Sequence, residues 1–245
     1  MTINNRKRRP QDRPGEQGNM FFYILLGVIL FAALAFTISR SFHSTSTSNM
    51  TKREAGLAAT SILDFGQRFA HAVDRSRRKN CSENDISFSN AIVSGYAHSP
   101  VVDDKCKLFD SKGGAISYTA PQPDWLDSTK SAQTLYGEWF LTGLANINGV
   151  GTASADLVLI LPYVKKEICL EIDHKLNIAT SSSYPPQDAG SSYDTTKYTG
   201  TFADTYEIRD SGGSDDLVGK QAGCFEANGT PATGTYHFYY VLIER

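Results

Sequence analysis

The stretch TKREAGLAATSILDFGQRFAHAVDRSRRK, residues 51–79, decides the architecture of this 245-residue chain. Its apolar side chains recur at every third or fourth position: Ala55, Ala58, Ile62, Phe65, Phe69 and Val73. That period is typical of an amphipathic helix that buries one face. Thr51 and Glu54 have the spacing of an N-terminal capping box, with Asn49 as the alternative cap, and basic residues gather at the other end. We therefore expect a stalk helix over residues 50–79.

Upstream of this helix, residues 20–38 (MFFYILLGVILFAALAFTI) contain no charged side chain. A helix of that length spans roughly 28 Å, which is close to the hydrocarbon thickness of a bilayer. The pattern predicts a transmembrane helix over residues 19–39, joined to the stalk helix by a Ser/Thr-rich linker over residues 40–49. Residues 1–18 are basic, polar and proline-containing, so we expect a disordered segment there.

Charge indicates the orientation of the predicted span. Residues 1–39 contain five basic and two acidic residues, a net charge of +3. Because the whole chain has a net charge of −2, the remaining residues have a net charge of −5. The positive-inside rule then places residues 1–18 in the cytoplasm, a single pass in the inner membrane, and the rest in the periplasm. The negative outer part argues against a nucleic-acid partner, because phosphate binding requires a basic surface.

Two further features concern the apolar segment. Ala33-Leu34-Ala35 follows the apolar core as a signal-peptidase site would, so a secretory signal cleaved after Ala35 is the alternative to a retained anchor. Small residues let neighbouring membrane helices approach closely. We therefore expect self-association, or association with related subunits, through this helix at Gly27, Ala32, Ala33 and Ala35.

Residues 80–245 read as a β-rich domain, because short β-branched and aromatic runs alternate with Gly, Asp and Ser. The predicted strands cover residues 86–91, 107–109, 115–118, 139–144 and 236–243, the last of them central in its sheet. A turn is expected at Gly113-Gly114, a helix over 165–176, and a long loop with one hairpin over 180–216, while 156–161 fits helix or strand. The predicted fold class is thus α+β: a transmembrane helix continuing into a stalk helix, then a mostly antiparallel domain with one or two short helices.

Four cysteines, Cys81, Cys106, Cys169 and Cys224, form no C-x-x-C pair, which disfavours a zinc ribbon or a thioredoxin-type site. An even number in an outward-facing domain indicates two disulfides, for which three connectivities are possible. We favour Cys81–Cys106 and Cys169–Cys224. In the chain-entropy model each would stabilise the fold by about 3–4 kcal/mol.

No specific catalytic motif is present: the sequence lacks G-x-S-x-G, H-E-x-x-H, a P-loop and G-x-G-x-x-G. The histidines are scattered at His43, His71, His98, His174 and His237. The cluster Asp210, Asp215 and Asp216 offers hard oxygen ligands for calcium but fits no EF-hand spacing, so a solvated acidic turn is the preferred interpretation. We therefore predict no catalytic residue, no metal site, no cofactor and no small-molecule substrate.

The chain combines a basic leader ending in Gly18, an apolar helix, an amphipathic helix that continues it, and a disulfide-bearing β domain. In this order of segments it resembles type IV pilins and type II secretion pseudopilins. The chain is most similar to a group of pilin-like bacterial proteins in four stretches: CSENDISFSNAIVSGY, CKLFDSKGGAISY, LVLILPYVKKEICLEIDHKLNI and YHFYYVLIER. The resemblance implies a non-enzymatic assembly subunit, with Gly18 as a second candidate cleavage site. Pilins carry Glu at the fifth mature position, where this chain has Tyr23.

Two rival functions remain. The first is a periplasmic binding or adhesion module whose contact surface is the loop over residues 180–216. The second is an anchored enzyme of unknown class, which would require a pocket with converging titratable groups.

Overall fold

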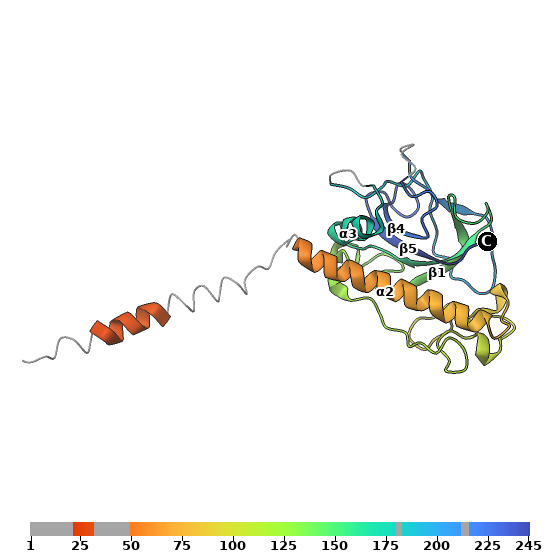
Figure 1. The fold of residues 1–245 in the computed structure, drawn as a ribbon, viewed down its shortest axis with the longest axis horizontal. Coiled ribbons are helices and arrows are strands. Elements are labelled where there is room, and N and C mark those ends of the chain that lie inside the picture. The colour runs from red at the N-terminus through yellow and green to blue at the C-terminus, as the bar shows by residue number, and fades with distance from the viewer. Residues whose placement is uncertain (1–21, 32–49, 180–182, 212–215) are drawn as a thin grey trace, which may run out of the picture. The chain divides into compact units, whose positions relative to one another are not determined.

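Figure 1 shows the computed structural model, which describes residues 22–31, 50–179, 183–211 and 216–245. The chain divides into two units, residues 1–49 and residues 50–245. In the first unit a helix covers residues 22–31, and its large apolar side chains are exposed. The segments predicted over residues 1–18 and 40–49, and the candidate cleavage sites at Gly18 and Ala35, lie outside the described residues.

The prediction of a membrane-spanning helix over residues 19–39 is wrong for the part that the structure describes. None of the helices in the described ranges is long and apolar enough to cross a membrane. This finding corrects both the predicted fold class and the predicted inner-membrane localisation. The second unit is an α+β domain with a mixed sheet.

The helix α2, Lys52–Arg77, begins at the cap predicted from the sequence. The Glu54 backbone N–H donates to Thr51 Oγ1 at 3.3 Å, and the Thr51 N–H donates to Glu54 Oε2 at 3.0 Å. This capping box satisfies backbone donors that the first helical turn leaves free. All six apolar positions expected to share one face are buried. The stalk prediction is therefore confirmed, with bounds two residues inside those expected.

The sheet contains five strands in the order β3-β1-β2-β5-β4. Their bounds are β1 Phe140–Ile147, β2 Asp156–Leu161, β3 Tyr206–Ile208, β4 Ala222–Glu226 and β5 Tyr236–Ile243. Neighbours pair antiparallel except β1 and β3, which are parallel. The predicted strand over residues 236–243 is confirmed with the same bounds, and it is interior, between β2 and β4.

Both faces of the sheet are covered, which explains why every residue of β2 is buried. Leu157, Leu159 and Leu161 belong to the core that α2 and α3, Lys166–Leu176, form with one face (Figure 1). Val158 and Ile160 belong to a second core on the opposite face. That second core is completed by Ile208 of β3 and by residues from the long connecting segments: Ile178, Tyr193 and Leu217.

Gly66 fixes how closely α2 approaches the sheet. A Cβ atom at this position would lie 2.6 Å from Cδ2 and 3.0 Å from Cγ of Tyr240 on β5. The missing side chain lets the tyrosine ring lie directly against the helix backbone.

Three predicted strands, over residues 86–91, 107–109 and 115–118, are not strands in the described chain. A single parallel bridge joins Ser87 to Lys107. The chain turns immediately afterwards, because Asn90 Oδ1 accepts the N–H groups of Ile92 and Val93 at 2.9 and 2.7 Å. The turn at Gly113-Gly114 is confirmed, and the hairpin expected within 180–216 is replaced by β3 and isolated bridges.

Candidate functional site

Two disulfides staple the domain. Cys81–Cys106 and Cys169–Cys224 have Cα–Cα distances of 5.6 and 5.3 Å, and all four cysteines are buried. These are the pairs predicted from the sequence. The first ties the chain just beyond α2 to a short turn, and the second ties α3 to β4. Because disulfides persist in oxidising compartments, the domain is periplasmic or extracellular.

The structure does not bring the remaining candidate site residues together. His71 is exposed on α2, and His174 on α3 lies 3.7 Å from Glu171. His43 and Asp215 lie outside the described residues, while Asp210 Oδ2 accepts the Asp216 N–H at 3.1 Å. Within the described ranges, no three His, Cys, Asp or Glu side chains group closely enough to hold a metal ion.

His237 on β5 is buried in a hydroxyl network. Its Nε2 lies 2.6 Å from Thr235 Oγ1, whose hydroxyl proton is donated to Ala232 O at 2.6 Å. Thr235 must therefore accept from His237 Nε2–H, and His237 Nδ1 accepts from the Tyr193 hydroxyl at 2.6 Å. Burial lowers the His237 pKa to about 3. The imidazole is thus a neutral structural group whose two nitrogens are both satisfied.

Asp173 is a buried carboxyl group beside the second disulfide. It follows Cys169 by one helical turn, and its Oδ1 accepts the Cys224 N–H at 2.8 Å. Its Oδ2 is buried and has no hydrogen-bond partner among the described residues. Burial raises the Asp173 pKa to about 8, so the group is mainly protonated at neutral pH. An acid of this kind could serve catalysis, but no described cavity is lined by it.

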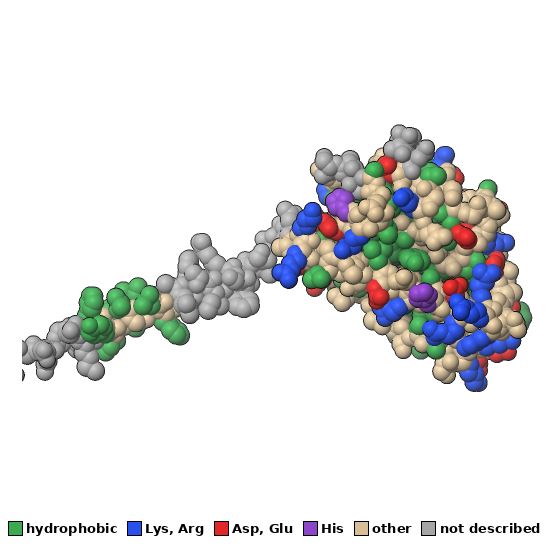
Figure 2. Space-filling view, in the orientation of Figure 1, with side chains coloured by type: hydrophobic (Ala, Val, Ile, Leu, Met, Phe, Trp, Pro, Cys, Tyr) green, Lys and Arg blue, Asp and Glu red, His purple; other side chains and the backbone are tan. Residues whose placement is uncertain are grey.

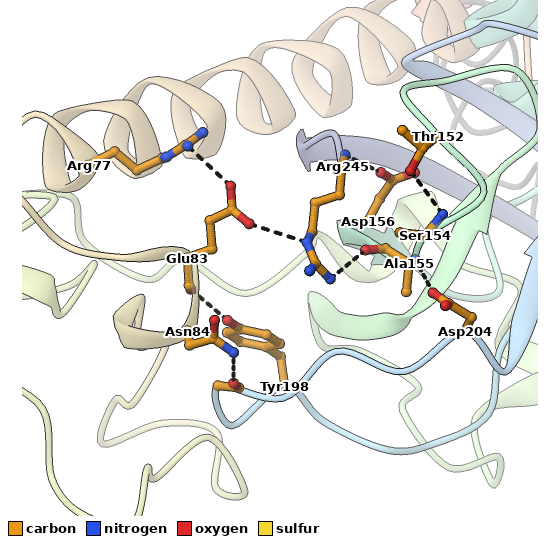
Figure 3. Close-up of polar contacts among 11 residues, drawn as sticks. Arg77, Glu83, Asn84, Thr152, Ser154, Ala155, Asp156, Tyr198, Asp204 and Arg245 are labelled. Carbon is orange, nitrogen blue, oxygen red and sulfur yellow. Dashed lines mark hydrogen bonds and ion pairs between the residues drawn. The ribbon is translucent and has the colours of Figure 1, made fainter.

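A polar network links the end of α2 to the end of β5 (Figure 3). Glu83 lies between two cations, with Arg77 Nη2 at 3.1 Å from Oε1 and Arg245 Nε at 3.2 Å from Oε2. The Arg245 backbone N–H donates to Asp156 Oδ1 at 2.9 Å, and its guanidinium lies 4.2 Å from the centre of the Phe202 ring. Every group in this network has a partner, which indicates a structural tie.

Tyr198 and Asn84 extend this tie to the loop over residues 198–204. The Tyr198 hydroxyl donates to Glu83 O and the Asn84 amide to Gly200 O, both at 2.6 Å (Figure 3). A polar hollow of about 370 Å³ lies beside these contacts. It is lined partly by Ser154, Phe202 and Asp204. The Asp204 carboxylate already accepts the Ala155 N–H, so this hollow offers few free groups to a ligand.

The exposed face of α2 borders a groove of about 470 Å³, here called the α2 groove. It is lined by Thr60, Leu63, Asp64 and Gln67 of α2, Lys175 and Leu176 of α3, and Tyr240 of β5. Leu63, Leu176 and Tyr240 are half-buried apolar side chains, and Asp64, Gln67 and Lys175 carry polar ends. Figure 2 shows apolar side chains gathered near the middle of this face and basic ones toward the C-terminal end of α2.

A second hollow of about 290 Å³, here called the tryptophan pocket, lies between α2 and residues 119–125. Its lining comprises Ser61, Asp64, Phe65, Arg68, Thr119, Ala120, Gln122, Trp125 and Trp139. Sequence reasoning missed this pocket because its members come from three separate segments. The one available signal was the concentration of aromatic and proline residues in YTAPQPDW, residues 118–125.

Comparison with protein-family models, with curated proteins and with solved structures finds no match. The resemblance to pilins therefore stays a prediction, and the function is inferred from the geometry described above.

Proposed function

We propose that this chain is a non-enzymatic structural or assembly component, similar to pilins and pseudopilins, whose copies associate through the exposed face of α2. The observation that carries this proposal is the two-sided character of the helix. One face of its 26 residues is buried on the sheet, while the other is exposed beside the α2 groove. A long helix with a groove along its flank is a suitable seat for a second helix.

The side chains along this face suit a helical partner. Leu57 is 64% exposed on the first turns of α2, and Leu63, Leu176 and Tyr240 are the apolar side chains that line the α2 groove. Burying one exposed leucine in an apolar contact contributes roughly 1.5–3 kcal/mol. Lys175 on the rim would orient the partner by charge. A partner α2 helix offers the matching apolar and charged groups.

The two disulfides support a role outside the cytoplasm. They fix the chain beyond α2 and the packing of α3 on β4, and α3 borders the α2 groove. Such bonds stabilise a domain mainly by restricting its unfolded state. A stable domain is what a subunit of an extracytoplasmic assembly requires.

Single-cysteine crosslinking tests the proposal. All four native cysteines are in disulfides, so Leu57→Cys, Asp64→Cys or His71→Cys introduces the one reactive thiol of each variant. A short bismaleimide applied to native cells should produce dimers at one or more of these positions. Val101→Cys is the matched control, because Val101 is 76% exposed and lies outside α2. Dimers with Val101→Cys alone, or with none of the variants, would contradict association through α2.

A further inference from the structure

The tryptophan pocket holds both tryptophans of the chain. Trp139 is fully buried at the start of the sheet, and the Phe65 ring stacks on it with a centroid distance of 4.1 Å and an interplanar angle of 11°. Trp125 is half-buried on the opposite side, in a short 3₁₀ turn. Trp125 is therefore the aromatic ring that the pocket leaves partly open to a ligand, and the buried Phe65–Trp139 stack forms the pocket's base.

Polar side chains surround these rings. Asp64 and Arg68, one turn apart on α2, form an ion pair with Nε 3.1 Å from Oδ2. The Arg68 guanidinium also lies 5.1 Å from the centre of the Phe65 ring. Gln122 adds an exposed amide, and Ser61 adds a hydroxyl. Because the carboxylate and the guanidinium neutralise each other, the rim provides hydrogen-bond donors and acceptors without a net charge.

The loop side of the pocket is held in place before any ligand arrives. The Trp139 indole N–H donates to Thr119 O at 3.0 Å, and its backbone N–H donates to the Tyr118 hydroxyl at 3.2 Å. The Lys165 N–H donates to Trp125 O at 2.9 Å. A preformed pocket binds with a smaller loss of conformational entropy than one that must order on binding.

We propose that the tryptophan pocket binds a neutral sugar unit. A pyranose ring has an apolar face of C–H groups, which stacks on an aromatic ring, and a rim of hydroxyls, which pairs with mixed donors and acceptors. The pocket offers both in one place and has no net charge to favour an ionic ligand. Its volume is at the lower end of the roughly 300–1,000 Å³ typical of ligand sites, which suits one sugar ring at the end of a larger saccharide. This inference does not depend on assembly through α2.

Because both tryptophans line the pocket, intrinsic fluorescence of the full-length protein reports on binding. Titration with cellobiose, maltose and N,N′-diacetylchitobiose at millimolar concentrations should give a saturable change for at least one of them. Gln122→Ala, an exposed position, should weaken that binding about tenfold without changing thermal stability, and Trp125→Ala should weaken it further. Tyr184→Ala removes a 49%-exposed aromatic ring outside the pocket and should leave binding unchanged.

Three results would overturn the proposal. The first is no saturable change with any of the three disaccharides. The second is binding that both Gln122→Ala and Trp125→Ala leave intact, because the sugar would then lie elsewhere. The third is saturable binding of a neutral leucine-containing peptide in place of every sugar, which would identify a peptide pocket.

Discussion

Replacing Asp173 with Asn should stabilise the domain at neutral pH. The buried carboxyl has a pKa raised to about 8 in the folded state, against an ordinary value of 3.8 in the unfolded chain. Between these values the folded state keeps a proton that the unfolded state has released. Stability from this group is therefore fully present below pH 4 and is lost as the pH rises toward 8.

The size of the stabilisation follows from the difference between the working pH and the pKa of Asp173 in the unfolded chain. A pH of 7 is about three units above the pKa of Asp173 in the unfolded chain. At 1.36 kcal/mol per unit, ionisation of the unfolded chain favours unfolding by about 4 kcal/mol. Asn has nearly the same shape and keeps an acceptor for the Cys224 N–H. Its NH₂ group takes the place of the protonated Oδ2, which likewise has no partner among the described residues. Asn therefore keeps the packing and removes the ionisation of the unfolded state.

Urea denaturation followed by tryptophan fluorescence at pH 4, 5, 6 and 7 measures this effect. The difference in unfolding free energy between Asp173→Asn and the wild type should be near zero at pH 4 and grow steadily toward pH 7. Asp74→Asn, on the exposed face of α2, is the control and should show no such growth. A variant that is no more stable than wild type at pH 7, or a difference that does not change with pH, would refute the reasoning.

Three further outcomes are expected. The pKa of His237 is lowered to about 3 in the folded state, so protonation of the unfolded chain favours unfolding as the pH falls. The unfolding free energy of the wild type should therefore fall by about 2 kcal/mol more than that of His237→Gln between pH 7 and pH 5. Equal decreases for the two proteins in urea denaturation would contradict this. Removing the second disulfide with Cys169→Ser and Cys224→Ser should cost about 2–5 kcal/mol in the same assay, and a change under 1 kcal/mol would disprove its stapling role. Gly66→Val should cost about 1–3 kcal/mol through its clash with Tyr240, and less in a Tyr240→Ala background; additive costs would show that the two sites do not interact.

The elements that could be predicted from the sequence are those with strong local signals. The three-to-four-residue period and the Thr51–Glu54 spacing define α2, and the continuous apolar run of residues 236–243 defines the interior strand β5. Residues 156–161 fitted either a helix or a strand. They form the strand β2 because they pair with β1 on one side and β5 on the other, and a single sequence does not reveal this pairing.

The failures have physical causes of the same kind. Residues 86–91, 107–109 and 115–118 have the composition of strands. In the described chain no strand pairs with them beyond the bridge between Ser87 and Lys107, so their β propensity did not lead to a sheet. The apolar run over residues 20–38 fits a membrane span by composition, yet no helix in the described ranges is long and apolar enough to cross a membrane. The tryptophan pocket could not be predicted, because Asp64, Trp125 and Trp139 lie in separate segments that only the tertiary fold brings together.

Thiol protection on α2 tests assembly through this helix most directly. The rate at which a membrane-permeant maleimide labels Leu57→Cys is measured in native cells and in dilute purified protein, with Val101→Cys as the reference. Association through α2 predicts that Leu57→Cys reacts much more slowly in cells than in dilute solution, while Val101→Cys reacts at the same relative rate in both. Equal relative rates for the two thiols in both settings would contradict the proposed function.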